Sequence, residues 1–172
     1  MAINVRVWGR KLHRIAAIVT AVPFLVILLS GFLLQMRGEY EWVQPPVQAG
    51  QKGDPTVSFE KLLTAAMGVP EAEVRTWDDI ERVDVRPNDG IAKVICKSRI
   101  EVQVDLRTGE VLQVAPRRSD LIAAIHNGSF FHEAAEEFIF VPTAVILLGL
   151  WGSGIYLWIL PLAVKFRRKS SK

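Results

Sequence analysis

Two long apolar runs divide the chain into three parts. The first run, from Ile15 to Met36, contains no charged residue. At about 1.5 Å per residue, a helix of this length covers roughly 33 Å, enough to cross a hydrocarbon core of roughly 30 Å. The second run, from Phe138 to Val164, is also free of charge. The pattern predicts two transmembrane helices.

Between the runs, helical spacing gives way to strand spacing. Apolar residues at helical spacing, with Ser58 as N-cap and Gly68 with Pro70 at the end, predict a helix over 58–67. Three or four antiparallel strands follow, at 78–86, 91–96, 100–106 and 111–114. The clearest alternation places Ile100, Val102, Val104 and Leu106 inward and Glu101, Gln103 and Asp105 outward.

Turn signals separate these elements. Pro87 to Gly90 (PNDG) predicts a turn, and Arg107 to Gly109 predicts a hairpin loop whose glycine takes a positive φ. Gln44 to Pro55 is rich in proline and glycine and has no periodicity, so we expect a linker there. A short helix is predicted from Ser119 to Asn127, with Ser119 as its N-cap, and Ser129 is predicted to cap the second span.

The charges fix an expected orientation. Both apolar runs are flanked on their outer sides, at 1–14 and 165–172, by basic residues without acids, and every acid lies in the middle of the chain. By the positive-inside rule both termini lie in the cytoplasm. The acidic middle is then periplasmic in a Gram-negative cell, and the protein belongs to the bacterial cytoplasmic (inner) membrane. The high pI comes from the tails, so the partner we expect is the lipid bilayer rather than nucleic acid.

The resulting fold class is an α+β membrane protein, with two transmembrane helices flanking a small extracytoplasmic domain of one helix and an antiparallel sheet. A cleaved signal peptide is the alternative for the first run, but the run is long and its exit lacks a small-x-small cleavage site. The predicted segments are a basic cytoplasmic segment (1–14), transmembrane helix 1 (15–36), a linker (37–56), the extracytoplasmic domain (57–118), an interfacial helical segment (119–137), transmembrane helix 2 (138–162) and a basic tail (163–172).

Small residues mark one face of each predicted span. Ala17 and Ala21 are four residues apart in the first span, as are Gly149 and Ser153 in the second. Such faces allow close helix packing. They predict association into a homodimer or a larger membrane-protein complex.

Short motifs carry a resemblance to a known family. The final hairpin reads V-D-x-x-T-G-x-V from Val104 to Val111, K-L-H-R opens the first span, I-H-N-G precedes the second, and G-x-Y-L-W lies near its end. The hairpin resembles the PepSY domain, and the whole chain resembles a minimal two-span member of the PepSY-associated transmembrane family. PepSY domains occur in protease propeptides and in many cell-envelope proteins. Longer four-span relatives resemble ferric-siderophore reductases with b-type haem on span histidines.

The resemblance makes His13 and His126 candidate haem ligands. A bis-histidine haem needs both ligands at one depth. These two residues lie at opposite ends of the predicted spans, so one chain cannot hold a haem with both. A symmetric dimer could pair two copies of each. The alternative is that His13 is an interfacial cation and His126 a helix-end residue favoured by the helix dipole.

Other chemistry-bearing residues are weaker candidates. His132, Glu133 and Glu136 form an HExxE pattern, which lacks the second histidine of a zinc-protease helix, so a solvated first helical turn is the simpler interpretation. Cys96 shares a strand face with Ala92 and Val94, which favours a core thiol over an intermolecular disulfide.

Two functions are compatible with these patterns. We find no catalytic constellation in the sequence, which favours a non-catalytic accessory or binding subunit of a cell-envelope or membrane complex. The alternative is a haem b redox subunit, connected with iron uptake, that passes electrons across the membrane as a dimer or with a partner. An enzyme-inhibitor role is a more distant analogy with protease propeptides.

Overall fold

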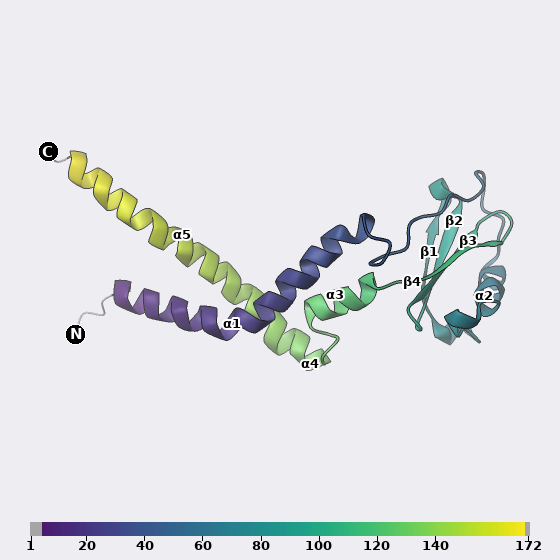
Figure 1. Cartoon of the computed structure of the whole chain (residues 1–172), viewed down its shortest axis with the longest axis horizontal. Coiled ribbons are helices and arrows are strands. Elements are labelled where there is room, and N and C mark those ends of the chain that lie inside the picture. Colours follow the sequence, from purple (N-terminus) through teal and green to yellow (C-terminus); the bar gives the residue numbers. More distant parts are fainter. Residues whose placement is uncertain (1–4, 171–172) are drawn as a thin grey trace. The chain divides into compact units, whose positions relative to one another are not determined.

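The computed structural model describes residues 5–170, and their side chains over 7–160. The chain forms two units: a helix unit of residues 5–31 and 124–170, and a sheet domain, Phe32–Ala123 (Figure 1). The predicted basic tail at 163–172 and the start of the basic segment at 1–14 lie outside the described side chains.

Two long helices dominate the helix unit. They are α1 (Val5–Gln35) and α5 (Val141–Ser170), and α5 follows a short helix α4 (Glu133–Ala135) and a π-helical turn (Glu136–Phe140). Segments Val7–Gly38 and Glu133–Leu160 are long and apolar enough to cross a membrane, as predicted. Pro23 lies inside α1, which bends near its middle (Figure 1). A proline removes one helical hydrogen bond and so permits such a bend.

The two long helices bury one narrow face each. Buried or half-buried side chains recur at alternating steps of three and four residues, a spacing of 3.5 that is typical of a coiled-coil seam. On α1 these are His13, Ala16, Thr20, Pro23, Ile27 and Ser30; on α5 and the π turn they are Phe140, Thr143, Leu147, Leu150, Gly154 and Leu157.

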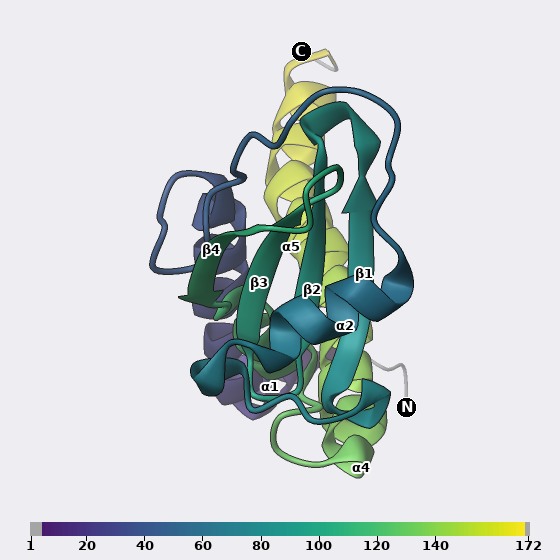
Figure 2. The ribbon, with the colours of Figure 1, turned by 90° about the vertical axis from the view of Figure 1, so that its right-hand side faces the viewer.

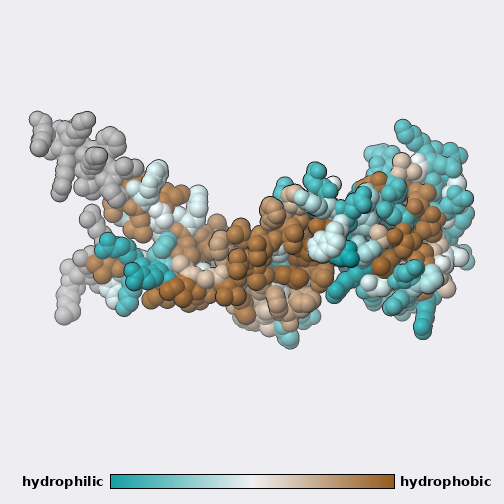
Figure 3. Space-filling model, viewed as in Figure 1, coloured by the Kyte–Doolittle hydropathy of each residue, from teal (hydrophilic) through white to brown (hydrophobic). Residues whose placement is uncertain are grey.

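Away from the basic start of α1, most of the remaining described surface of the two helices is apolar and exposed, and it appears as the brown middle of Figure 3. Val22 is 74% and Leu148 70% exposed. In water this exposure would be costly, whereas in a bilayer these side chains face lipid tails. Two membrane-spanning helices require exposed apolar surfaces of this kind.

The sheet domain contains helix α2 (Phe59–Met67) and four antiparallel strands in the order β1-β2-β3-β4. The strands are β1 (Ile80–Arg86), β2 (Ile91–Cys96), β3 (Ile100–Asp105) and β4 (Val111–Pro116). Short 3-10 turns occupy Met36–Gly38, Pro70–Ala72, Trp77–Asp79 and Pro87–Asp89. The Ser58 side chain caps α2 by accepting from the Lys61 N–H at 3.3 Å.

The core lies between α2 and one face of the sheet, with α2 drawn in front of the strands in Figure 2. Leu62 and Ala66 of α2 pack with apolar strand residues. The alternation predicted for the third strand is confirmed, because Val102, Val104 and Leu106 belong to this core.

The opposite face of the sheet is also buried, which corrects the expected exposure of Glu101, Gln103 and Asp105. Their exposed fractions are 0%, 0% and 2%. Residues 43–51, which we name the strap, bond Gln103 and Asp105, whereas Glu101 is bonded by Arg117. The strap falls in the stretch expected to be a free linker. Val43 and Pro45 are buried, so this stretch is packed although it has no regular structure.

Helix α3 (Ser119–Asn127) has the bounds that the sequence predicted, but both predicted serine caps are wrong. Ser119 is buried as the first helical residue, and within the described chain its hydroxyl has no partner. The Ser129 hydroxyl donates to the Asn127 side chain at 2.8 Å instead of capping the second span. The cap before α4 is instead His132.

Candidate functional site

Two histidines join α1 to the other helices of the helix unit. At one end, the Nδ1 of His13 lies 2.9 Å from the Ser153 hydroxyl of α5. That hydroxyl also lies within donating distance of the Leu150 carbonyl, at 3.0 Å, an arrangement in which His13 Nδ1 is the donor to Ser153. His13 therefore links the packed faces of α1 and α5 by a hydrogen bond. Neither sequence hypothesis for His13, a haem ligand or an interfacial cation, included this role.

His126 makes the second link, from the end of α3. Its Nδ1 lies 3.1 Å from the Ile27 carbonyl and 3.0 Å from the Ser30 hydroxyl, both on α1. A carbonyl can only accept, and the Ser30 hydroxyl already donates to the Val26 carbonyl. Nδ1 therefore carries a proton, and in the neutral form of this imidazole the lone pair is on Nε2.

Gly31 permits this close approach. A Cβ added at Gly31 would lie 3.1 Å from Cε1 of His126, tighter than ordinary contacts. The seam hydroxyls of Thr20 and Ser30 are 2% and 5% exposed, and both satisfy carbonyls one turn earlier in α1. Ser30 also contacts His126 of α3, and hydrogen bonds between helices of this kind stabilise helix packing in lipid.

A hollow of about 230 Å³ lies beside His126. Ile27 of α1, Glu136 and Phe140 of the π turn, and Ala144 of α5 contribute to its walls. A π turn widens a helix locally and is frequent at functional sites. Two ionisable side chains, His126 and Glu136, thus line one small and otherwise mostly apolar hollow.

The geometry does not fit a haem held by one chain. His13 contacts α5 from position 13 of α1, whereas His126 contacts α1 at Ser30, 17 residues further along. At 1.5 Å per residue this is about 26 Å, far beyond the span of two axial ligands on one iron. The hollow is also smaller than the 300 to 1,000 Å³ of typical ligand pockets.

The predicted small-residue faces divide into two groups. Ser153 lies in the seam, bonded to His13. Ala17, Ala21 and Gly149 are exposed, and a Cβ at Gly149 would meet nothing within 4 Å. These three residues do not pack α1 on α5, and their role in association with another chain stays a prediction.

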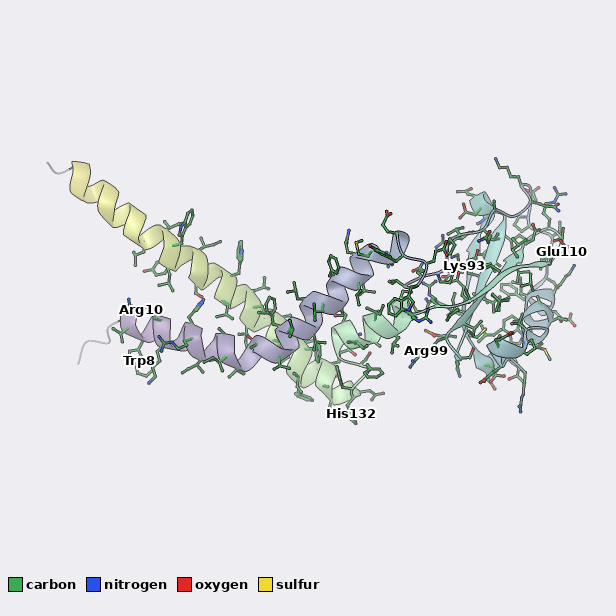
Figure 4. All side chains as sticks on the ribbon, viewed as in Figure 1. Trp8, Arg10, Lys93, Arg99, Glu110 and His132 are labelled. Carbon is green, nitrogen blue, oxygen red and sulfur yellow. The ribbon has the colours of Figure 1, made fainter. Side chains whose placement is uncertain are left out.

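His132 is a helix cap. Its Nδ1 accepts the Ala134 N–H at 3.1 Å and its side chain is exposed at the start of α4 (Figure 4). Glu136 instead meets Asn127, whose Nδ2 lies 3.4 Å from Oε1. Among the residues searched, no three His, Cys, Asp or Glu side chains form a metal-binding group.

The sheet domain contains a buried network of charged groups. Lys93 of β2 and Glu101 of β3 form an ion pair of 2.8 Å in which both side chains are 0% exposed. Arg117 bonds the other oxygen of Glu101 and also reaches Asp120 at 3.0 Å. Burial alone would lower the pKa of Arg117, but Glu101 and Asp120 raise it, so the guanidinium stays charged.

The DxxTG hairpin motif has a structural role, because its aspartate bonds both the hairpin and the strap. Asp105 accepts the N–H groups of Arg107 and Thr108 in the hairpin and of Gln51 in the strap, at 2.7 to 2.8 Å. Burial would raise the pKa of Asp105, but these three backbone bonds lower it overall. Gly109 has φ +75°, as the hairpin prediction required.

Cys96 is a core side chain, as the strand pattern predicted. It is 0% exposed, and burial raises the pKa of its thiol to about 11. A protonated, inaccessible thiol neither reacts readily nor reaches another chain. The alternative of an intermolecular disulfide through Cys96 is therefore wrong for the folded protein.

An α+β domain inserted between two helices that can span a membrane defines a membrane-anchored α+β protein. The family model described as PepSY-associated TM region matches residues 10–172. The chain therefore belongs to this family, which confirms the resemblance carried by the hairpin and span motifs. Comparisons with curated proteins and with solved structures found no match.

Proposed function

We propose that the protein is a non-catalytic accessory subunit of a cell-envelope complex. Its sheet domain would be held at the periplasmic surface of the inner membrane by α1 and α5 and would bind a partner protein. The buried ionic groups support the non-catalytic part of this proposal, because their bonds are structural. Lys93 pairs with Glu101 across β2 and β3, and Asp105 binds the strap.

One surface feature carries the proposal. Phe59 and Trp77 form an edge-to-face pair, with ring centroids 6.2 Å apart, outside the core of the sheet domain. They are 66% and 43% exposed. Exposed aromatic residues that contribute little to the core are enriched in protein interfaces and often dominate binding energy.

Photo-crosslinking in living cells tests the proposal. A benzoylphenylalanine at Phe59 is expected to give a discrete protein adduct, because the ring lies in the proposed contact. The same group at Glu110, exposed on the hairpin (Figure 4), is the control and should give none. Trp77→Ala should remove the adduct at Phe59. Equal adducts at Phe59 and Glu110, or none at either, would contradict the proposal.

A haem-binding redox subunit is the second candidate, and one observation favours it. His126 has its Nδ1 held by a backbone carbonyl, the arrangement that leaves Nε2 as a ligand nitrogen in many metal and haem sites. Because one chain does not supply both ligands at one depth, a second copy or a partner would have to contribute.

Absorption spectroscopy separates the two candidates. Protein purified from haem-replete cells in mild detergent should be colourless if it is only an accessory subunit. A Soret band that disappears in His126→Ala would establish the redox candidate. Retention of the band in both His13→Ala and His126→Ala would contradict ligation by these histidines.

A further inference from the structure

The hollow beside His126 has an imidazole and a carboxylate among its lining residues. The His126 ring is fixed by its Nδ1 contacts with Ile27 and Ser30, and its Nε2 has no hydrogen-bond partner in the part of the chain that the structure describes. A neutral imidazole fixed in this tautomer is the form that coordinates metal ions through Nε2.

Glu136 supplies a second ligand type on the wall of the same hollow. Its carboxylate is half-buried, and its one described contact is the weak bond from Asn127 at 3.4 Å. Imidazole with carboxylate is a ligand combination for divalent transition metals. A water molecule occupies about 30 Å³ of liquid, so 230 Å³ leaves room for an ion and several waters.

We propose that His126 and Glu136 together bind one divalent transition-metal ion, with water completing its coordination. No third His, Cys, Asp or Glu joins them among the residues searched, so the ion exchanges readily rather than being permanently held. This site does not depend on the accessory function, and it differs from the haem hypothesis because it needs one chain only.

Cobalt(II) titration of the full-length, tag-free and haem-free protein in detergent tests the site. One ion per chain should bind, with visible d–d absorption that zinc(II) displaces. His126→Gln and Glu136→Gln should each weaken binding at least about tenfold, since loss even of an outer-shell partner can cost this much.

Two matched controls lie on the same segment. His132→Gln and Glu137→Gln alter exposed side chains outside the hollow and should leave the affinity unchanged. Ala144→Leu removes no ligand but fills the hollow, and it should also abolish binding. Circular dichroism checks that each variant is folded.

Several results would contradict the metal-site proposal. Binding that is undetectable in the wild type, or that keeps its affinity in either Glu136→Gln or His126→Gln, would overturn the proposal. So would a loss in His132→Gln as large as that in His126→Gln, because it would place the ion on exposed residues.

Discussion

Glu101→Ala is expected to destabilise the sheet domain by roughly 3–5 kcal/mol. The substitution leaves the buried Lys93 without its only described hydrogen-bond partner and removes one acceptor from Arg117. An uncompensated buried charge costs far more than the pair contributes, because water cannot solvate it. Amide hydrogen exchange of β2 and β3, measured on the full-length protein, should accelerate by roughly 10²- to 10⁴-fold.

Glu81→Ala is the matched control, since Glu81 pairs with Arg82 at the surface with half of its side chain exposed. This change should stay within about 0.5 kcal/mol. The double replacement Lys93→Met with Glu101→Leu should recover part of the loss, because it removes the stranded ammonium together with its partner. Unchanged exchange in Glu101→Ala would show that the network is not buried in solution.

Gly50→Ala is expected to release the strap and to cost about 1–3 kcal/mol. A Cβ at Gly50 would lie 2.1 Å from the Gly90 carbonyl oxygen and 2.7 Å from its carbon, so backbone must move. The Gly90 carbonyl is held in place, because it accepts the Leu106 N–H at 2.9 Å. The amides of Gln48 and Gln51, which donate to Gln103 and Asp105, should lose protection first.

Gly38→Ala provides the control in the same domain, since nothing lies within 4 Å of a Cβ there. Its stability and exchange pattern should match the wild type. A Gly50→Ala protein with native protection at Gln48 and Gln51 would mean that the strap is not held against the turn.

Local periodicity was sufficient to predict most of the fold. The bounds of β2 and α3 follow directly from strand alternation and from helical spacing, and the apolar face of β3 lies in the core. These elements are readable because each residue's environment depends on neighbours two to four positions away in the sequence.

The burial of the second face of the sheet could not be predicted from local residue spacing. Gln103 holds the strap through the Pro46 carbonyl and the Gln48 N–H, which are backbone groups 57 and 55 positions away. Contacts to backbone leave no pattern in side-chain type. One signal of this burial was present in the sequence. Strand β2 (IAKVIC) contains a single polar residue, Lys93, whereas a strand with one solvent-exposed face normally carries more polar residues.

In the candidate site, too, the sequence indicates the residues but not their distant partners. Sequence motifs singled out His13 and His126, but their partners Ser153 and Ser30 are 140 and 96 positions away. The available hint was Ser30 followed by Gly31 within an otherwise apolar span, a polar and a small residue where helices approach closely.

Cysteine accessibility in intact cells tests the central claim, that two spans hold the sheet domain outside with both termini in the cytoplasm. Cys96 is buried with a raised pKa, so the wild-type background should label very little. A membrane-impermeant maleimide should label Glu110→Cys in intact cells and Ser171→Cys only after lysis. Labelling of Ser171→Cys in intact cells, or protection of Glu110→Cys until lysis, would contradict this arrangement.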